Sequence, residues 1–439
     1  MTNKILINQT INPFNKTIEI EGDKSLSIRW ALLASQSLGK STSTNLLKSE
    51  DVLNTLNCLK KLGVKINLKK NKCIIHGVGI NGFNNNKKNI ILNAGNSGTL
   101  ARLIMGLLVH TKNKIKLIGD KSLSKRDFER VINPLKKFGA KFKSNSGNLP
   151  LTITGTNNPK PIKFTENIGS AQCKSAIMLA ALNTKGETII KARKSRNHSE
   201  LLYKYLNIPI KIKNKNKFDL IKINGGSNFK SFNYKIPSDI SSAAFFIILT
   251  TLSKNSKLII KNVNVNPTRT GILKILRIMG VNIILRKAKI YKGEKIADIH
   301  VKSTKKIKSI NCPTNLNSFA IDEFLIIFLL AAKAKGISYF KNLSELNQKE
   351  SPRLKWGAKI LKLIGVKTII TKDSIKIFGN PAIKNKKRIV IKNYLGDHRV
   401  FMTSVIAGLV FGGKWSIYDK NSIKTSFPTF LKIINKIKK

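Results

Sequence analysis

Residues 95–108 read GNSGTLARLIMGLL, a polar cluster followed at once by a run of small and apolar residues. Asn and Ser are favoured at helix N-termini, so the stretch predicts a helix that its own polar residues cap. Five further segments have the same form, and each begins with Asp, Ser or Gly-Ser: DKSLSIRWALLAS (23–35), GSAQCKSAIMLAAL (169–182), SDISSAAFFIILTTL (238–252), DEFLIIFLLAAKA (322–334) and DHRVFMTSVIAGLV (397–410). A pattern that recurs six times predicts a chain built from repeats.

A second, amphipathic segment follows each of the six: SEDVLNTL (49–56), SKRDFERVINPL (124–135), SRNHSELLYKYL (195–206), NPTRTGILKIL (266–276), ESPRLKWGAKIL (350–361) and TSFPTFLKII (425–434). These segments are predicted to be helices capped in the same way as the first set. Four of them run into a glycine stop, at Gly63, Gly139, Gly280 and Gly365, and a fifth ends near Asn207. With β-rich stretches around each pair of helices, the sequence predicts six βαβαββ units of about 70–85 residues.

The halves of the chain are predicted to meet at YKIPSD (234–239), where a proline interrupts an extended stretch. A partner crossing is expected near Glu21 and Gly22, with the first strand, KILINQT (4–10), joining the second half. The predicted domains are therefore 21–238, and 1–20 together with 239–439, with three units each. The fold class is α/β, and the helix N-termini are expected to face the cleft between the domains.

The charge of the chain is extreme, since 81 Lys and Arg against 22 Asp and Glu leave +59 in 439 residues. Such a balance suggests a polyanionic partner. The lysines, however, are spread along the whole chain with Asn and Ile, as a biased nucleotide composition produces. No basic block is confined to one segment, and no aromatic-interleaved RNA motif occurs, so no specific nucleic-acid partner is predicted.

Several classes of protein do not fit the sequence. No apolar run reaches the roughly 18–20 residues that a membrane span needs, and the first residues do not have the pattern of a secretion signal, so a soluble protein of the cytoplasm is expected. The four cysteines, Cys58, Cys73, Cys173 and Cys312, lack the spacing of a zinc cluster or a disulfide scaffold, so neither a metal nor a cofactor is predicted. The run NNNKK (84–88) is predicted to be a surface loop.

The first turns of the predicted helices contain basic side chains, at Lys24, Arg29, Arg102, Lys174, Arg269, Arg353 and Arg399. Capping does not require a cation there, and the helix macrodipole disfavours one. An anion bound at these helix starts would be stabilised both by the free N–H groups and by the cations. The pattern therefore predicts a site for a small substrate with several negative charges.

Eleven segments match one protein family, in its order and at its spacing: GDKSLSIR (22–29), NAGNSGTLAR (93–102), GDKSLSKRDFERVINPL (119–135), SAQCKSA (170–176), SRNHSE (195–200), SDISSAAFF (238–246), NPTRTG (266–271), IDEF (321–324), KESPR (349–353), GDHR (396–399) and TSFP (425–428). On these segments the chain resembles the enolpyruvyl transferases, and among them the EPSP synthase family, over essentially its full length. The resemblance implies a two-domain inside-out α/β barrel that acts as a monomer without a metal or cofactor. It also implies inhibition by glyphosate, a competitor of phosphoenolpyruvate.

The reaction that the resemblance implies joins the enolpyruvyl group of phosphoenolpyruvate to the 5-hydroxyl of shikimate 3-phosphate and releases phosphate. Protonation of the methylene carbon makes the neighbouring carbon electrophilic, the hydroxyl adds to it, and loss of phosphate leaves an enolpyruvyl ether. This chemistry needs cations for two phosphates and a carboxylate, together with a general acid and a general base.

Matching positions imply the roles of individual residues. Shikimate 3-phosphate is expected to be held by Ser25, Arg29, Ser170, Gln172, Lys174, Ser195 and Arg196. Phosphoenolpyruvate is expected to be held by Lys24, Arg126, Arg353 and Arg399, beside the backbone of Asn96 to Gly98. Asp322 and Lys349 bracket the reacting hydroxyl, with Asp322 as general base, while Glu350 exchanges the methyl proton and Lys24 joins the catalytic group. Asp322 could instead serve only as a helix cap, and His398 as a neutral supporting residue.

The chain departs from the family pattern at four positions. Pro352 replaces an aspartate in KESDR, which removes a carboxylate that could orient Arg353 or Lys349. Leu100 is large where a small residue is usual in the loop after Gly98. Asn347 stands in place of a basic residue, and Asp127 in place of a proline.

Two alternatives stay open at this stage. The sister transferase, which acts on UDP-N-acetylglucosamine, carries a reactive cysteine in a Pro-Arg-Cys-Gly-like loop, and this sequence lacks such a loop. A catalytically degraded, basic homologue that binds nucleic acid is the second alternative. The charged residues at the helix starts are all retained, which favours an active enzyme.

Overall fold

The computed structural model describes residues 3–80, 82–83, 89–111 and 113–439. They form two compact units: unit 1 comprises Met1–Glu21, Pro237–Ile290 and Lys295–Lys439, and unit 2 comprises Gly22–Ile236 and Tyr291–Glu294. The predicted loop at 84–88 lies outside the described residues. The assignment of 21–238, and of 1–20 with 239–439, to two functional domains stays a prediction.

Unit 2 is built from three four-stranded sheets with one common strand order. The first strand of each sheet is parallel to the second, and the other neighbours are antiparallel. The sheets are, in order, β14 (Asn233–Lys235), β3 (Leu38–Thr44), β5 (Lys72–Val78) and β4 (Lys65–Leu68); β6 (Ile90–Asn93), β7 (Lys114–Ile118), β9 (Asn148–Thr154) and β8 (Lys141–Asn145); and β10 (Lys163–Glu166), β11 (Gly186–Arg193), β13 (Phe218–Gly225) and β12 (Ile210–Asn214). The second and third of these sheets follow the predicted βαβαββ order along the chain, whereas the first sheet takes the strand β14 from the end of the segment Gly22–Ile236.

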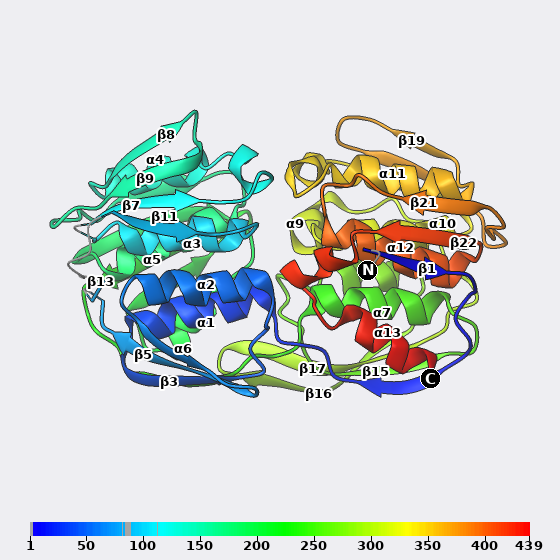
Figure 1. Cartoon of the computed structure of the whole chain (residues 1–439), viewed down its shortest axis with the longest axis horizontal. Coiled ribbons are helices and arrows are strands. Elements are labelled where there is room, and N and C mark those ends of the chain that lie inside the picture. The colour runs from blue at the N-terminus through cyan, green and yellow to red at the C-terminus, as the bar shows by residue number, and fades with distance from the viewer. Residues whose placement is uncertain (1–2, 81, 84–88, 112) are drawn as a thin grey trace. The chain divides into compact units, whose positions relative to one another are not determined.

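Two helices accompany the sheet of each repeat in unit 2 (Figure 1), and the second repeat also has a 3₁₀ turn. They are α1 (Lys24–Gln36), α2 (Glu50–Lys61), α3 (Gly98–Leu108), η1 (Leu123–Lys125), α4 (Glu129–Lys137), α5 (Ala171–Leu182) and α6 (His198–Tyr205), with η1 present in the second repeat. Helices α3 and α5 approach closely at Gly106, where a Cβ atom would lie 2.1 Å from the carbonyl oxygen of Ala176. Only glycine fits that contact.

Unit 1 also holds three sheets. They are β16 (Ile283–Tyr291), β17 (Glu294–Lys302), β15 (Lys257–Asn264) and β2 (Asn15–Ile18); β18 (Gly336–Phe340), β20 (Ile375–Gly379) and β19 (Thr368–Ile370); and β1 (Lys4–Ile7), β22 (Lys414–Tyr418) and β21 (Arg388–Ile391). Its helices are α7 (Ile240–Leu252), α8 (Gly271–Ile278), η2 (Thr314–Leu316), α9 (Asn317–Ala320), α10 (Phe324–Ala332), η3 (Ser344–Gln348), α11 (Arg353–Ile364), α12 (His398–Phe411), η4 (Lys420–Thr425) and α13 (Phe430–Lys438). The sheet of β18 has isolated parallel bridges at Lys308 and Asn311 where the other repeats have a first strand.

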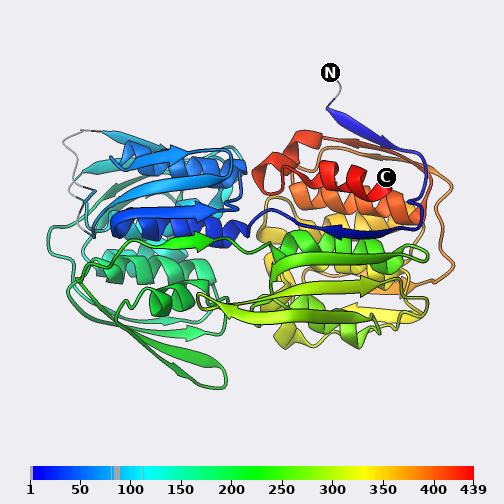
Figure 2. The ribbon, with the colours of Figure 1, turned by 90° about the horizontal axis from the view of Figure 1, so that it is seen from below.

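Two strands pair with segments that are distant in the sequence. Strand β2, blue in Figure 2, runs parallel to the green strand β15 in unit 1. Strand β14 runs parallel to β3 in unit 2, and β1 pairs with β22, which confirms that KILINQT joins the second half of the sequence. Unit 1 thus completes two of its sheets with strands from the start of the sequence, and unit 2 completes one sheet with a strand from the end of its segment Gly22–Ile236.

The first helix of each repeat is almost entirely buried. In α10, FLIIFLLAA, every residue is buried, and α12 is buried at 13 of its 14 positions. In the part of the chain that the structure describes, no helix combines the length and the apolarity that crossing a bilayer requires. These apolar helices instead form the cores of the two units.

Five of the six first helices begin at a side-chain cap, as predicted. Asp23, Ser97, Ser170, Asp239 and Asp397 each accept a hydrogen bond from a backbone N–H group in the first turn of the helix that follows. Each of these bonds satisfies an N–H group that the helix itself leaves unpaired.

The sixth first helix is an exception. Helix α10 begins at Phe324 and its N-cap residue is Glu323, so the prediction that Asp322 caps this helix is wrong. The Asp322 carboxylate lies 3.6 Å from both Lys349 Nζ and Arg353 Nη1, and these cations draw it away from the helix start.

The second helices were predicted to be capped in the same way, and this prediction is also wrong. The N-cap residues of these six helices make no side-chain cap hydrogen bond: Ser49, Phe128, Asn197, Thr270, Pro352 and Thr429. At Asn197, Thr270 and Thr429 the backbone is turn-like, with ψ of 24°, 26° and 2°, rather than extended as a capping residue requires.

The predicted glycine stops are confirmed. Gly63, Gly139, Gly280 and Gly365 have φ angles of 94°, 107°, 83° and 93°, and Asn207, at the fifth stop, has a φ of 54°. This left-handed conformation ends a helix, and glycine adopts it without a steric penalty.

We expect the four cysteines to resist modification in the folded protein. All four are buried and free, and burial raises the thiol pKa to about 12 for Cys58, Cys73 and Cys173 and to about 11 for Cys312. Because the thiolate is the reactive form, a disulfide reagent at pH 8 should label less than one thiol in the native protein and four after unfolding in guanidinium. Rapid native labelling of any one cysteine would contradict the burial of that thiol.

Candidate active site

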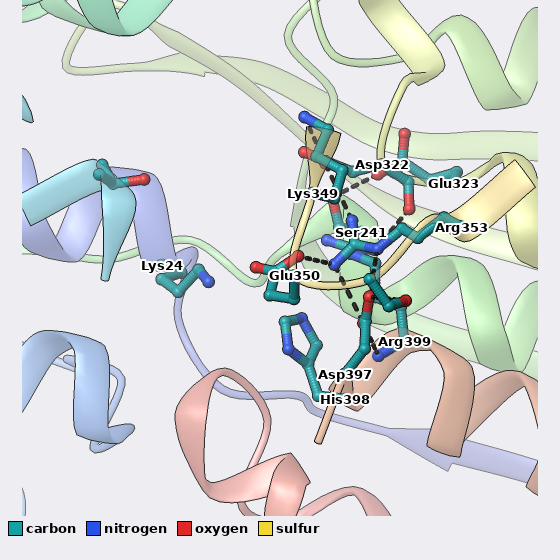
Figure 3. Close-up of polar contacts among 12 residues, drawn as sticks. Lys24, Ser241, Asp322, Glu323, Lys349, Glu350, Arg353, Asp397, His398 and Arg399 are labelled. Atoms are coloured by element: carbon teal, nitrogen blue, oxygen red, sulfur yellow. Dashed lines mark hydrogen bonds and ion pairs between the residues drawn. The ribbon is translucent and has the colours of Figure 1, made fainter. Parts of the chain in front are cut away.

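Arg353 is the first residue of α11 and its side chain is only 2% exposed, yet three carboxylates surround it (Figure 3). Its Nε donates to Asp397 Oδ2 at 2.9 Å and its Nη2 donates to Asp397 Oδ1 at 3.1 Å. Nη2 also donates to Glu350, and Asp322 Oδ1 lies 3.6 Å from Nη1. Burial disfavours the charged guanidinium, but Asp397 and Glu350 outweigh that effect and hold the pKa of Arg353 above its ordinary value.

Asp397 joins several parts of this cluster. It is fully buried, accepts a hydrogen bond from Ser351 Oγ at 2.9 Å, and caps α12 by accepting from the N–H group of Arg399 at 2.9 Å. From the sequence, Asp397 was predicted only to cap the helix that it starts. Its acidic character and its place at a helix start were visible, but its partner Arg353 is 44 residues away in the sequence.

Asp322 and Lys349 lie together beside Arg353. Lys349 Nζ is 3.6 Å from Asp322 Oδ1, and Arg399 Nη1 donates to the main-chain carbonyl oxygen of Asp322 at 2.7 Å. The structure therefore brings together five predicted site residues of unit 1: Asp322, Lys349, Glu350, Arg353 and Arg399. The cluster holds three cations and, counting Asp397, three carboxylates.

A second network lies at the start of α7. Arg269 Nη2 donates to Ser241 Oγ at 2.8 Å and to Asp239 Oδ1 at 3.2 Å, and Ser241 Oγ donates to Glu323. Arg269 does not lie in the first turn of a helix, since α8 begins only at Gly271. Its guanidinium binds the residues that start the neighbouring helix.

In unit 2, two predicted lysines pair with acids at the start of the following helix. Lys24 Nζ lies 2.8 Å from Asp51 Oδ2. Lys174, which is completely buried, has its Nζ 2.5 Å from Glu200 Oε1. Asp51 and Glu200 lie in the quoted SEDVL and SRNHSE segments, but sequence analysis assigned neither of them to the site.

Arg29 is held by hydroxyl groups in unit 2. Its Nε donates to Ser199 Oγ at 2.9 Å, its Nη2 donates to Ser175 Oγ at 3.0 Å, and its Nη1 donates to the carbonyl oxygen of Ser25 at 3.2 Å. The two hydroxyls lie 2.8 Å from each other. These two hydroxyl groups and the carbonyl oxygen fix the direction of the guanidinium.

The first turn of α5 carries three predicted substrate-binding residues. Ser170 caps the helix and its N–H donates to Glu166 Oε1 at 3.0 Å. Gln172 accepts a hydrogen bond from Arg102 Nη1 at 2.9 Å through its Oε1 and donates to Thr99 Oγ1 at 2.9 Å through its Nε2. Lys174, described above, completes the set.

Ser195 and Arg196 precede α6. The Ser195 side chain is buried, and its hydroxyl has no hydrogen-bond partner among the described residues, while Arg196 is half-buried. A buried hydroxyl of this kind can accept or donate a hydrogen bond to a ligand.

Asn96, Gly98 and Arg126 lie around the start of α3. Asn96 Nδ2 donates to Asp120 Oδ2 at 2.6 Å, and Arg126 Nη2 donates to Asn96 Oδ1 at 3.3 Å. A Cβ atom on Gly98 would lie 3.1 Å from Arg126 Nη1 and 3.1 Å from Arg102 Nη1. The absent side chain at Gly98 therefore keeps the space beside two guanidinium groups clear.

Three of the four departures from the family pattern have local structural roles. Leu100 is buried in α3 rather than part of a loop. Asp127 Oδ1 accepts a hydrogen bond from the N–H of Glu129 at 2.7 Å, at the start of α4. Asn347 Nδ2 donates to the carbonyl oxygen of Lys372 at 3.2 Å.

Pro352 was interpreted as the loss of a carboxylate that orients Arg353, and for Arg353 this interpretation is wrong. Asp397, Glu350 and Asp322 already surround the guanidinium. Pro352 is the N-cap residue of α11, just outside the first turn, and its carbonyl oxygen accepts a hydrogen bond from the N–H of Trp356 at 3.0 Å.

Comparisons with known proteins agree with this arrangement of fold and side chains. The structure matches that of EPSP synthase from Acinetobacter baumannii with a TM-score of 0.87 and 34% identity, covering 99% of this chain and 98% of that chain. It also matches an enolpyruvyl transferase from Streptomyces tendae with a TM-score of 0.78 at 12% identity, covering 100% and 98% of the two chains. Two proteins named 3-phosphoshikimate 1-carboxyvinyltransferase, from Ruthia magnifica and Petrotoga mobilis, are 41% and 37% identical over 97% and 99% of this chain and 96% and 99% of their own lengths.

The chain has the two-domain α/β fold of the enolpyruvyl transferases. The sequence profile of the EPSP synthase (3-phosphoshikimate 1-carboxyvinyltransferase) family matches residues 8–434. The chain therefore belongs to the EPSP synthase family, which is a family of transferases.

We expect Asp397→Asn to lower the free energy of unfolding by about 3–5 kcal/mol, because it leaves the buried Arg353 cation short of its main partner. The control is Glu187→Gln, which breaks an exposed 2.9 Å pair with Lys222 and should cost at most about 1 kcal/mol. Guanidinium unfolding of both variants gives the comparison. Equal effects would show that Asp397 contributes no more than a surface charge.

Proposed function

We propose that this chain transfers the enolpyruvyl group of phosphoenolpyruvate to the 5-hydroxyl of shikimate 3-phosphate and releases phosphate, as a step toward aromatic amino acids. The observation that carries the proposal is the cluster of Asp322, Lys349, Glu350, Arg353 and Arg399 in unit 1. A reaction that moves protons next to bound anions needs carboxylates beside buried cations. Membership of the EPSP synthase family supports the same activity and does not favour the UDP-N-acetylglucosamine or nucleic-acid alternatives.

Shikimate 3-phosphate is proposed to bind to unit 2. Arg29 and Lys174 supply the positive charge for its phosphate, and both are held in place, by hydroxyl groups and by Glu200 respectively. The other proposed ligands are Ser25, Ser170, Gln172, Ser195 and Arg196. Hydroxyl and amide groups at helix starts suit a substrate with several hydroxyls and two anionic groups.

Phosphoenolpyruvate is proposed to be held by Lys24 and Arg126 of unit 2, beside Asn96 and Gly98, and by Arg353 and Arg399 of unit 1. A substrate carboxylate would compete with Glu350 for Arg353 Nη2, while Asp397 keeps the guanidinium oriented from its buried side.

In the proposed mechanism Asp322 accepts the proton of the 5-hydroxyl, with Lys349 beside it. Glu350 delivers a proton to the methylene carbon, and the hydroxyl oxygen adds to the adjacent carbon. Glu350 then takes a proton back from the methyl group as phosphate leaves, and the new C–O bond remains. Lys24 and Arg126 are proposed to stabilise the phosphate as negative charge builds on it.

The finer assignments complete the proposal: the protein works as a monomer in the cytoplasm, with small-molecule substrates only. Four buried free thiols suit a reducing compartment.

The direct test is phosphate release from phosphoenolpyruvate with shikimate 3-phosphate as acceptor. UDP-N-acetylglucosamine as acceptor and a reaction without acceptor are the controls. Phosphate should appear with shikimate 3-phosphate alone. Release with the UDP-sugar would identify the sister activity, and no release with either acceptor would indicate the degraded homologue.

Asp322→Asn should lower kcat by roughly 10²–10⁴-fold, because an amide cannot accept the proton of the hydroxyl. Helix α10 does not use this side chain as its cap, so the thermal unfolding midpoint should change little. Steady-state kinetics and calorimetry on the same preparation separate the two effects. A variant with the turnover of the parent protein would move the general base elsewhere.

Gly98→Ala should weaken inhibition by glyphosate more than it raises KM for phosphoenolpyruvate. The added methyl would lie 3.1 Å from Arg126 Nη1 and fill the space beside it. Glyphosate, whose chain is one atom longer than that of phosphoenolpyruvate between carboxylate and phosphorus, needs that space more. The ratio of Ki to KM in both proteins is the measurement, and an unchanged ratio would show that the inhibitor does not use this space.

A further inference from the structure

The tip of the hairpin between β16 and β17, Tyr291–Glu294, belongs to unit 2, although the strands themselves lie in a sheet of unit 1. Its last residue, Glu294, makes a buried contact with His198 at the start of α6. Glu294 Oε1 lies 2.6 Å from His198 Nδ1, and both side chains are fully buried. An ionised carboxylate can only accept, so Nδ1 carries the proton of this bond.

The rest of the tip is fixed as well. Tyr291 accepts a hydrogen bond from the N–H of Lys235 at 3.0 Å, and Lys292 Nζ lies 5.4 Å from the ring centre of Tyr205 and 5.6 Å from that of Tyr291. Gly293 has a φ of 87°, and a Cβ atom there would lie 3.0 Å from the carbonyl oxygen of Leu201 in α6. The tip is therefore seated closely on α6 and its surroundings.

His198 begins the helical turn that holds two proposed phosphate ligands. The next residue, Ser199, accepts the hydrogen bond from Arg29 Nε at 2.9 Å. The residue after that, Glu200, lies 2.5 Å from Lys174 Nζ. A shift of this turn would move both of those partners together.

We propose that Glu294 and His198 are positioning residues for the phosphate of shikimate 3-phosphate. Glu294 holds His198, His198 fixes the first turn of α6, and this turn orients Arg29 through Ser199 and Lys174 through Glu200. The inference rests on the proposed function, because it assigns those two cations to that phosphate. The hairpin tip thus serves substrate binding without touching the substrate.

Stability alone is a weak account of this contact. Burying a carboxylate costs free energy that a single partner scarcely offsets, so a well-packed apolar pair would serve stability equally well. An apolar pair does not fix the orientation of the helix start. A short hydrogen bond between two rigid groups does fix it.

A matched control lies on the same helix. Tyr203 is fully buried in α6, and its hydroxyl donates to the carbonyl oxygen of Met178 at 2.9 Å. Tyr203→Phe removes one buried hydrogen bond that anchors α6 and leaves the first turn intact. This variant tests whether the loss of any hydrogen bond that anchors α6 weakens the binding of shikimate 3-phosphate.

The experiment measures the dissociation constant of shikimate 3-phosphate by titration calorimetry with the full-length protein. Glu294→Ala should weaken binding by roughly tenfold, a coupling typical of neighbouring residues in one network. Glu294→Gln keeps an acceptor for Nδ1–H and should recover most of the affinity. Tyr203→Phe should bind like the parent protein, and KM for phosphoenolpyruvate should stay within about twofold in all three variants.

A double substitution checks the proposed path. If Glu294 acts through His198, then His198→Ala with Glu294→Ala should weaken binding no more than the larger single effect. Additive losses would overturn the inference, as would unaltered binding by Glu294→Ala or an equal loss in Tyr203→Phe. If Glu294→Ala does not fold, the Glu294→Gln variant tests the inference instead. Its dissociation constant for shikimate 3-phosphate must lie between those of the parent protein and of His198→Ala.

The parent protein separates the two proposals. If it binds shikimate 3-phosphate and the Glu294 variants bind equally well, the positioning role is wrong and the proposed function stands. If the parent protein itself does not bind shikimate 3-phosphate, both proposals fail.

Discussion

A cation buried at a helix start needs an anion or oriented hydroxyl groups beside it, and this constraint governs the candidate site. The helix end adds partial positive charge to that of the side chain, so burial without a partner would neutralise the residue or expel it. Asp397 forms an ion pair with Arg353, Asp51 with Lys24 and Glu200 with Lys174. The two lysine pairs each join the two helix starts of one repeat, whereas Arg353 begins the second helix of the fifth repeat and Asp397 caps the first helix of the sixth.

The charge pairs follow the repeats, but their direction differs between the two units. In unit 2 the first helix carries the lysine and the second helix the acid, as in Lys24 with Asp51. In unit 1 the acid caps the first helix and the arginine lies just before the second, as in Asp239 with Arg269. In these pairs the cation thus comes from the first helix in unit 2 and from the segment before the second helix in unit 1.

The sequence was sufficient for features that depend on neighbouring residues. Apolar periodicity and polar starts predicted the repeats and five of the six first-helix caps, and the glycine stops followed from the φ angle that only glycine adopts freely. It failed where the outcome depends on distant residues. Glu323 replaces Asp322 as the helix start because Lys349 and Arg353 attract Asp322, and Asp397 and Glu200 gained their roles from partners 44 and 26 residues away. Three of the second helices, α6, α8 and α13, lack caps because their N-cap residues have turn-like backbone angles. Two others, α4 and α11, have Phe128 and Pro352 as N-cap residues, whose side chains cannot accept a hydrogen bond.

The pairing of β1 with β22 has a consequence for synthesis on the ribosome. Residues 4–7 leave the ribosome long before their partner strand, 414–418, which is made about 410 residues later. At roughly 5–20 residues per second this delay lasts about 20–80 s. Strand β2 likewise cannot pair until residues 257–260 are made. In unit 2, by contrast, β14 is available to pair with β3 once residue 235 is made. Unit 2 can therefore form its sheets while β1 and β2 are still unpaired, and β1 is among the last strands to reach its native contacts.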